Sequence, residues 1–339
     1  MSSRRCSGRH ADRLQLCLFS RRFSRRQVGG SGSIIYPNQG CSRCNQWDMP
    51  QDRSGTAPLQ FYYKFPDPLD FFPGMLYHIS TTETDQADGM EGGTQNMDDF
   101  DRIFLTGDKH GDFCDLIRDS LRYGFTERDL LIILGDVGVN YYGKAFGGSK
   151  DRESKERLSQ IPSTVLCIHG NHEMRPTSRE IGDQYRRIEW MNDAASIEDA
   201  FPRLVFAEDG ARYRINGRDF LVIGGAYSVD KWYRILRRFR WFPDEQLTEE
   251  EMDSIRQKVK SHGNREDIIL AHTCPMDRRP LECFLSGIDD SQVDTTTERF
   301  LQEITERIEY NQFYCGHWHT DKQDGKIRFL FHDIVMPDQ

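Results

Sequence analysis

The stretch Gly107-Asp108-Lys109-His110-Gly111-Asp112 directly follows the apolar run Ile103-Phe104-Leu105. The apolar run predicts a short buried strand that ends in a turn. An Asp and a His two residues apart at the end of a strand can direct a carboxylate oxygen and an imidazole nitrogen to one point, and the flanking glycines permit a sharp turn. Such mixed ligands suit first-row divalent cations, so the stretch indicates a metal site. Alone, such a motif is far more often an ordinary polar turn than a metal site.

The same pattern, an apolar run followed at once by a potential metal ligand, occurs four more times. The polar blocks are Gly135-Asp136, His169-Gly170-Asn171-His172-Glu173, His272-Thr273 and Gly316-His317-Trp318-His319. In open α/β sheets, ligands bind beyond the carboxyl ends of the strands. Five strands that all end in Asp, Asn or His therefore predict an α/β fold with a metal site at the strand ends.

In this order, the five blocks resemble those of the calcineurin-like metallophosphoesterases, from about Phe100 to the C-terminus. The resemblance implies a four-layer α/β/β/α sandwich with two mixed β-sheets flanked by helices. It also implies an enzyme that hydrolyses phosphate mono- or diesters with two divalent metal ions. Residues 224–231 and 314–322 are similar to those of small stand-alone bacterial members of the family.

The resemblance implies a role for each residue of the blocks. The seven expected metal ligands are Asp108, His110 and His319 for one ion, Asn171, His272 and His317 for the second, and Asp136 as the bridge between them. His172 is the expected catalytic histidine beside the scissile bond, and a structural histidine behind the ligands is the alternative. Manganese is the metal expected from the resemblance, and the mixed oxygen and nitrogen ligands also suit Fe, Zn, Ni or Co.

This inventory fits the chemistry of phosphate-ester hydrolysis. Two metal ions about 3.5–4 Å apart can clamp the attacking and leaving oxygens and lower the pKa of a shared water. A bridging carboxylate such as Asp136 would hold the two cations close despite their repulsion. His172 could donate a proton to the leaving oxygen or neutralise the charge that develops there.

The loop after Asp136 differs in sequence from the corresponding loop of the protein Ser/Thr phosphatases in the family. Those proteins carry Gly-Asp-x-Val-Asp-Arg-Gly after the second strand. Their Asp and Arg fall on Val139 and Asn140 of this chain. The phosphate-gripping arginine and the orienting partner of the catalytic histidine are therefore missing from these positions, which argues against a protein phosphatase. Arg175 could supply the phosphate contact, because a guanidinium matches phosphate oxygens. Asn140 and Arg175 are the candidate substrate-binding residues, with a surface arginine as the alternative for Arg175.

Residues 1–99 differ from the domain expected over residues 100–339. Residues 1–30 carry eight arginines and one acidic residue, a composition typical of transit peptides or nucleic-acid-binding arms. Met97 lies a few residues before the first predicted strand, so the simpler interpretation of residues 1–96 is a disordered or non-native extension. The lone Cys41-Ser42-Arg43-Cys44 motif lacks the second ligand pair that a zinc site needs.

Charge and cysteine usage limit the partners. The 45 basic and 54 acidic residues give a net charge of −9, which belongs to residues 100–339 because residues 1–99 are balanced. An acidic domain does not favour nucleic acid, so a nuclease or cyclic-nucleotide phosphodiesterase is the secondary hypothesis. A catalytically silent scaffold is the alternative from another class, although every expected ligand is present. A phosphorylated small molecule or nucleotide is the expected substrate, with no membrane partner. Nine cysteines without a pattern predict reduced thiols in the cytoplasm.

Local patterns predict the remaining elements. Helices are expected over residues 112–123, 149–158, 248–260 and 297–310, and strands over 204–207, 211–215, 218–223 and 328–331. Asn216-Gly217 predicts a tight hairpin between the second and third of these strands, within the antiparallel second half of the sandwich. The basic and aromatic run 232–241 is interpreted as a packed loop with a solvated edge, or as a loop that meets a phosphate and a base.

Overall fold

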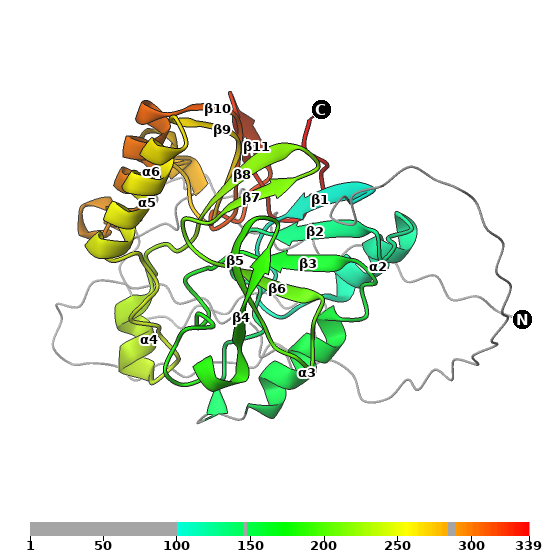
Figure 1. Cartoon of the computed structure of the whole chain (residues 1–339). Coiled ribbons are helices and arrows are strands. Elements are labelled where there is room, and N and C mark those ends of the chain that lie inside the picture. Colours follow the sequence, from blue (N-terminus) through cyan, green and yellow to red (C-terminus); the bar gives the residue numbers. More distant parts are fainter. Residues whose placement is uncertain (1–99, 145–147, 284–288, 339) are drawn as a thin grey trace, which may run out of the picture. The chain divides into compact units, whose positions relative to one another are not determined.

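A computed structural model describes residues 100–144, 148–283 and 289–338 of this chain (Figure 1). The expectations for residues 1–99, including the extension and the cysteine motif, lie outside these residues. The helices are α2 (Cys114–Arg122), α3 (Ser149–Leu158), α4 (Lys231–Arg237), α5 (Glu249–Ser261) and α6 (Thr296–Arg307). The strands are β1 (Arg102–Thr106), β2 (Asp129–Ile133), β3 (Thr164–Cys167), β4 (Arg186–Trp190), β5 (Asp193–Ile197), β6 (Leu204–Ala207), β7 (Arg212–Ile215), β8 (Arg218–Ile223), β9 (Arg265–Ala271), β10 (Glu309–Cys315), β11 (Lys322–Asp324) and β12 (Ile327–Phe329). None of the helices in this part of the chain has the length and apolar character needed to cross a bilayer.

The strands form two mixed six-stranded sheets. The first has the order β1-β2-β3-β6-β5-β4, with β1, β2, β3 and β6 parallel and the β5 and β4 pairings antiparallel. The second has the order β11-β12-β10-β9-β8-β7, with β8, β9, β10 and β12 parallel between two antiparallel edge strands. The predicted α/β class with two mixed sheets is confirmed.

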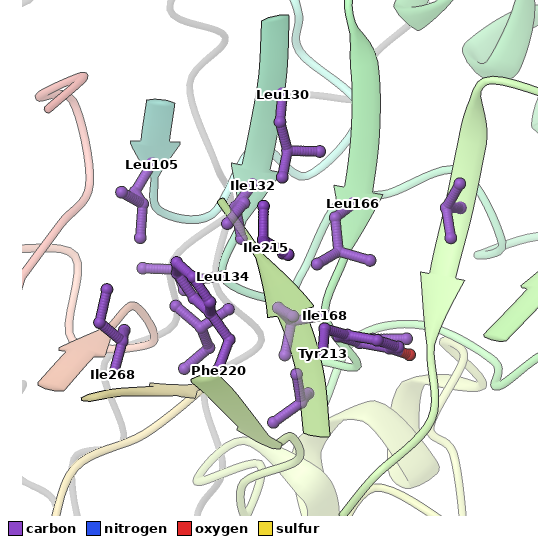
Figure 2. Close-up of a cluster of buried hydrophobic side chains, with 14 of the residues drawn as sticks. Leu105, Leu130, Ile132, Leu134, Leu166, Ile168, Tyr213, Ile215, Phe220 and Ile268 are labelled. Carbon is purple, nitrogen blue, oxygen red and sulfur yellow. The ribbon is translucent and has the colours of Figure 1, made fainter. Parts of the chain in front are cut away.

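Three apolar layers hold the sheets and helices together. Alternate residues of β2 point to opposite faces of the first sheet, as the two-residue period of a strand requires. Leu130 and Ile132 pack between the two sheets, together with Tyr213 and Phe220 of the second sheet (Figure 2). The intervening residues Leu131 and Ile133 pack on the other face of the first sheet. They contact the layer that includes Phe113 and Leu116, at the start of α2. These strands are buried on both faces, which explains their continuous apolar runs.

The second sheet is covered in the same way. Leu221 and Ile223 of β8 pack with Met252 and Ile255 of α5 and with Phe300 of α6. Helices α5 and α6 lie beside this sheet, and α2 and α3 lie beside the first (Figure 1). The described residues therefore form the predicted α/β/β/α sandwich.

Most of the predicted elements are confirmed, and two are wrong in ways that have a physical cause. Residues 309 and 310 were expected to end a helix, but α6 ends at Arg307 because Glu309 and Tyr310 pair with Arg265 and Glu266 of the parallel strand β9. The strand 204–207 was expected in the second sheet, but it pairs in parallel with β3 of the first. In both cases a ladder between distant segments decides the outcome.

A short helix and a hairpin were also not predicted. Part of the basic and aromatic run forms helix α4 rather than a loop. Strands β4 and β5 form a hairpin whose turn residues Met191 and Asn192 both have positive φ angles, a conformation that Met rarely adopts.

Helix α5 begins with a complete capping box. The Glu251 N–H donates to Oγ1 of Thr248 (3.2 Å), and the Thr248 N–H donates to Oε2 of Glu251 (2.8 Å). We expect Thr248→Ala to lower the free energy of unfolding by about 1 kcal/mol, because one helix N–H loses its acceptor. Urea denaturation followed by circular dichroism measures this change. Thr248→Ser keeps the hydroxyl and is the control, and an equal loss in the Ser variant would contradict the capping role.

Candidate metal centre

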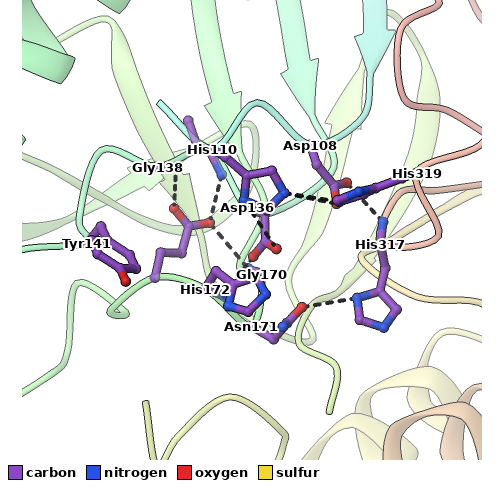
Figure 3. A network of polar contacts seen from close by, with 12 residues as sticks. Asp108, His110, Asp136, Gly138, Tyr141, Gly170, Asn171, His172, His317 and His319 are labelled. Atoms are coloured by element: carbon purple, nitrogen blue, oxygen red, sulfur yellow. Dashed lines mark hydrogen bonds and ion pairs between the residues drawn. The ribbon is translucent and has the colours of Figure 1, made fainter. Parts of the chain in front are cut away.

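The predicted ligands follow five parallel strands that belong to two different sheets. Asp108 and His110 follow β1, Asp136 follows β2 and Asn171 follows β3, all in the first sheet. His272 follows β9, and His317 and His319 follow β10, both in the second sheet. The strands of both sheets end toward one place, and the ligand side chains converge there (Figure 3).

The first group of side chains consists of Asp108, His110 and His319. Their potential ligand atoms all lie within 4.8 Å of one another. Oδ2 of Asp108 lies 3.1 Å from Nε2 of His319 and 3.9 Å from Nε2 of His110, and the two imidazole nitrogens are 3.0 Å apart. Burial alone would raise the pKa of Asp108, but His319 and His272 hold it well below its usual range. The group therefore offers an anionic oxygen and two imidazoles to a cation.

The two oxygens of Asp108 show whether this group of side chains fits a metal ion. Oδ1 accepts a hydrogen bond from the His317 N–H (2.9 Å), whereas Oδ2 is buried and accepts no well-formed hydrogen bond from the described residues. A buried charged oxygen without such a partner is costly. A divalent cation beside Oδ2 would satisfy it, so the residues present fit a metal ion.

The second group consists of Asn171, His272 and His317. Oδ1 of Asn171 lies 2.8 Å from Nε2 of His272 and 3.0 Å from Nδ1 of His317. The amide is oriented by its Nδ2, which donates to Oγ of Ser228 (2.9 Å). Nδ1 of His272 lies 2.7 Å from the carbonyl oxygen of Leu134, which can only accept, so Nε2 is the nitrogen available to a metal.

Asp136 also sets the protonation of His272. Burial opposes the charge of this imidazole, but Asp136 raises its pKa to about 9. Because a metal ligand must be deprotonated, cation binding at Nε2 would release a proton.

Asp136 lies between the two groups. Its Oδ2 is 3.9 Å from Nδ1 of His110 and 3.6 Å from Nε2 of His272, one residue of each group. Burial would raise the pKa of Asp136, but the neighbouring histidines, His272 and His172 foremost, hold it well below its usual range. This is the position that a bridging carboxylate needs, and the bridging role itself stays a prediction.

The backbone at the centre is strained. Four of the predicted ligands have left-handed φ angles: His110 (48°), Asp136 (48°), His317 (66°) and His319 (47°). A non-glycine residue in this region costs of the order of 1 kcal/mol or more, and such residues cluster at functional sites. Beside them, a Cβ at Gly170 would lie 2.1 Å from both the amide nitrogen and Oδ1 of Asp136, so only glycine fits there.

Glu173 holds the loops that present the ligands. Its buried carboxylate accepts the backbone N–H groups of Val137, Gly138 and Gly170, each at 3.3 Å, and so joins the loops after β2 and β3. Burial and the nearby Asp136 raise the pKa of Glu173 to about 8. The sequence placed this residue in a metal-ligand block without a role, and its contacts indicate a supporting one.

His172 lies at the edge of the centre. Its backbone N–H donates to Oδ1 of Asp136 (2.8 Å), and the centroid of its ring is 5.7 Å from that of the His110 ring. Burial lowers the pKa of His172 to about 4, with Asp136 opposing the shift and Arg234 adding to it. The imidazole is therefore neutral at neutral pH.

The two candidate substrate-binding residues lie in different surroundings. Arg175 donates to Oε1 of Glu251 (2.6 Å) and to the carbonyl oxygens of Asp244 and Gln246. Its guanidinium is thus engaged with the segment that leads into α5. Asn140 is buried, and its Oδ1 accepts from the Tyr185 hydroxyl (2.7 Å) while its Nδ2 has no hydrogen-bond partner among the described residues. Phosphate binding by either residue stays a prediction.

The sequence did not single out Arg234 of α4, whose Nη2 lies 3.5 Å from Nε2 of His172. Its Nε donates to both carboxylate oxygens of Asp230 (2.8 Å each). The spacing of Asp230 and Arg234, four residues apart, is typical of an ion pair on one helix face. Recognising it required knowing that the run 232–241 contains a helix.

One family model and several solved structures match this chain. The family model described as calcineurin-like phosphoesterase matches residues 101–321. Among solved structures, TT1561 of Thermus thermophilus is 14% identical, with 70% of this chain and 98% of that chain covered and a TM-score of 0.38. Phosphopantetheinyl hydrolase (PptH) from Mycobacterium tuberculosis is also 14% identical, with 68% and 88% covered and a TM-score of 0.36. A search of curated proteins found no match.

Proposed function

The chain belongs to the calcineurin-like phosphoesterase family, and from that premise we propose that it is a dinuclear metal-dependent phosphoesterase acting on phosphate mono- or diesters. The observation that supports this most is the place of Asp136. Its buried Oδ2 faces His110 of one ligand group and His272 of the other, at 3.9 and 3.6 Å. A carboxylate between two sets of ligands is what two neighbouring cations require.

In this proposal each ion is held by residues from both sheets. The first site consists of Asp108, His110, His319 and the shared Asp136, and the second of Asn171, His272, His317 and the shared Asp136. When bound, the ions would lower the pKa of a water to supply hydroxide near neutral pH and stabilise charge on the phosphate oxygens. Manganese is the proposed metal on the family resemblance, and the mixed oxygen and nitrogen ligands also suit Fe, Zn, Ni or Co.

His172 would act at the leaving oxygen. It stands beside Asp136 without belonging to either ligand group, and its imidazole is neutral in the free protein. A bound phosphate would place negative charge beside His172 and raise its pKa again. The imidazolium could then donate a proton to the leaving oxygen or stabilise its charge.

Metal removal and reconstitution test the proposal. The chelated protein should be inactive, and Mn²⁺ should restore hydrolysis of p-nitrophenyl phosphate, bis-p-nitrophenyl phosphate or both, with two metal equivalents per chain by mass spectrometry. The same screen with alkyl and nucleotide esters would define the substrate class. Two bound ions without hydrolysis of any ester would identify a silent scaffold, and a chain that binds no metal would contradict the proposed centre.

A further inference from the structure

We propose that Arg234 binds a phosphate oxygen of the substrate, an inference that rests on the proposed phosphoesterase function. Position 140, in the loop after β2, is Asn in this chain and supplies no guanidinium to the centre. Arg234 lies beside His172 but belongs to a different element, the short helix α4 that follows β8.

Burial of Arg234 is the first observation. Only 9% of the residue is exposed, although the residues on either side of it, Tyr233 and Ile235, are half-buried and exposed. Arginine is seldom buried to this degree unless it is paired. Asp230 supplies the pairing charge, because Nε of Arg234 donates to both its carboxylate oxygens at 2.8 Å. The pair holds the guanidinium in one orientation.

The outer nitrogens of Arg234 are the second observation. Nη1 lies 3.4 Å from the Tyr141 hydroxyl and 3.3 Å from the carbonyl oxygen of Arg240, and Nη2 lies 3.5 Å from Nε2 of His172. These contacts are longer than a normal N–H···O hydrogen bond, whereas those of Nε are not. Nη2, the nitrogen nearest to His172, is therefore weakly engaged, and its N–H groups are available to a better acceptor placed beside it.

A phosphate oxygen is that acceptor on chemical grounds. Nη2 of Arg234 and Nε2 of His172 lie 3.5 Å apart at the edge of the centre. An anionic oxygen between the two side chains would attract both and take a charge-assisted hydrogen bond from the guanidinium. Two neighbouring arginines are engaged elsewhere, Arg175 with Glu251 and Arg240 with Glu180.

The test compares Arg234→Gln with Arg237→Gln, a matched change on the exposed part of the same helix. In the Mn²⁺-loaded protein, Arg234→Gln should raise the Kd for inorganic phosphate about 10-fold or more and lower kcat/KM by about 10- to 100-fold. Metal content should not change, and Tm shows whether the loss of the partner of Asp230 destabilises the fold. Arg237→Gln should leave all four quantities unchanged. Arg234→Lys, which keeps the charge but loses the fork, should fall between wild type and Arg234→Gln.

Phosphate affinity tests the role of Arg234 without requiring that the protein hydrolyse an ester, so this inference and the proposed function can fail separately. If the wild type binds phosphate but hydrolyses no ester, the proposed function fails, and weaker phosphate binding by Arg234→Gln still supports the role of Arg234. If phosphate affinity is the same in Arg234→Gln and wild type, or if Arg237→Gln weakens it equally, the inference is wrong. If Arg234→Gln lowers Tm, the phosphate affinity of Arg234→Lys decides instead, provided that the Tm of that variant is unchanged. Weaker phosphate binding by Arg234→Lys than by wild type supports the inference, and equal binding contradicts it.

Discussion

Asp136→Asn should remove most of the catalytic activity and most of the bound metal. The loss should go well beyond the roughly 10- to 100-fold that is typical for groups that only support a ligand. Asp136 faces both ligand groups with a single buried oxygen, so the amide deprives both ions of a shared negative charge. The substitution changes the size of the side chain very little, and the Asn oxygen can still accept the N–H of His172.

Metal analysis after dialysis and kcat/KM measured in saturating Mn²⁺ check this result. The variant should lose close to two equivalents of metal, whereas changing a residue of one group, such as His319→Ala, should lose close to one. Asp112→Asn is the matched control, because Asp112 lies in the loop after β1, close in sequence to the ligands Asp108 and His110, but is exposed and accepts the backbone N–H of Cys114. Loss of a single equivalent with turnover preserved would show that Asp136 does not bridge.

His172→Ala should keep both metal ions and lose activity by about 10²–10⁴, the usual range for general acid–base catalysis. The imidazole contributes no atom to either ligand group, so its removal should not affect metal content. The loss should be small for p-nitrophenyl phosphate, whose leaving group needs little protonation. It should be full for an alkyl phosphate, whose leaving group needs a proton.

Comparing an activated with an unactivated ester distinguishes a general acid from the other roles that His172 could have. An equal loss on activated and unactivated esters would make His172 a residue that binds or positions phosphate rather than an acid. Loss of metal from the variant would make it a ligand. His262→Ala is the control, since this exposed histidine ends α5 and bonds only within that region.

The sequence was sufficient to predict the fold class and the convergence of the ligands for a simple reason. Parallel strands buried on both faces are unbroken apolar runs, and their carboxyl ends lie at one edge of a sheet. Residues such as Asp136 and His272, placed directly after these runs, must therefore lie near that edge. What they do there depends on the family resemblance and on experiment, because spacing alone does not define a role.

Contacts between segments far apart in the chain could not be predicted. Arg175 is three residues from His172 in sequence, yet its guanidinium is directed to Glu251 of α5. Arg234 is far from His172 in sequence, yet it lies beside it because α4 approaches the ends of the first sheet. Helix α4 is also only seven residues long, too short for a clear helical period. The surroundings of His172 are thus a product of the packing of the two sheets.

The division of the ligands between the two sheets affects how the protein is made and kept folded. Both predicted ion sites need residues that follow β10, so neither can exist until the ribosome has synthesised His317 and His319. A partly synthesised chain gains nothing from the metal. In the finished protein, separating one sheet from the other would dismantle both sites at once. The free energy of metal binding would therefore oppose that separation, and the cellular supply of the ion would influence how long the protein survives.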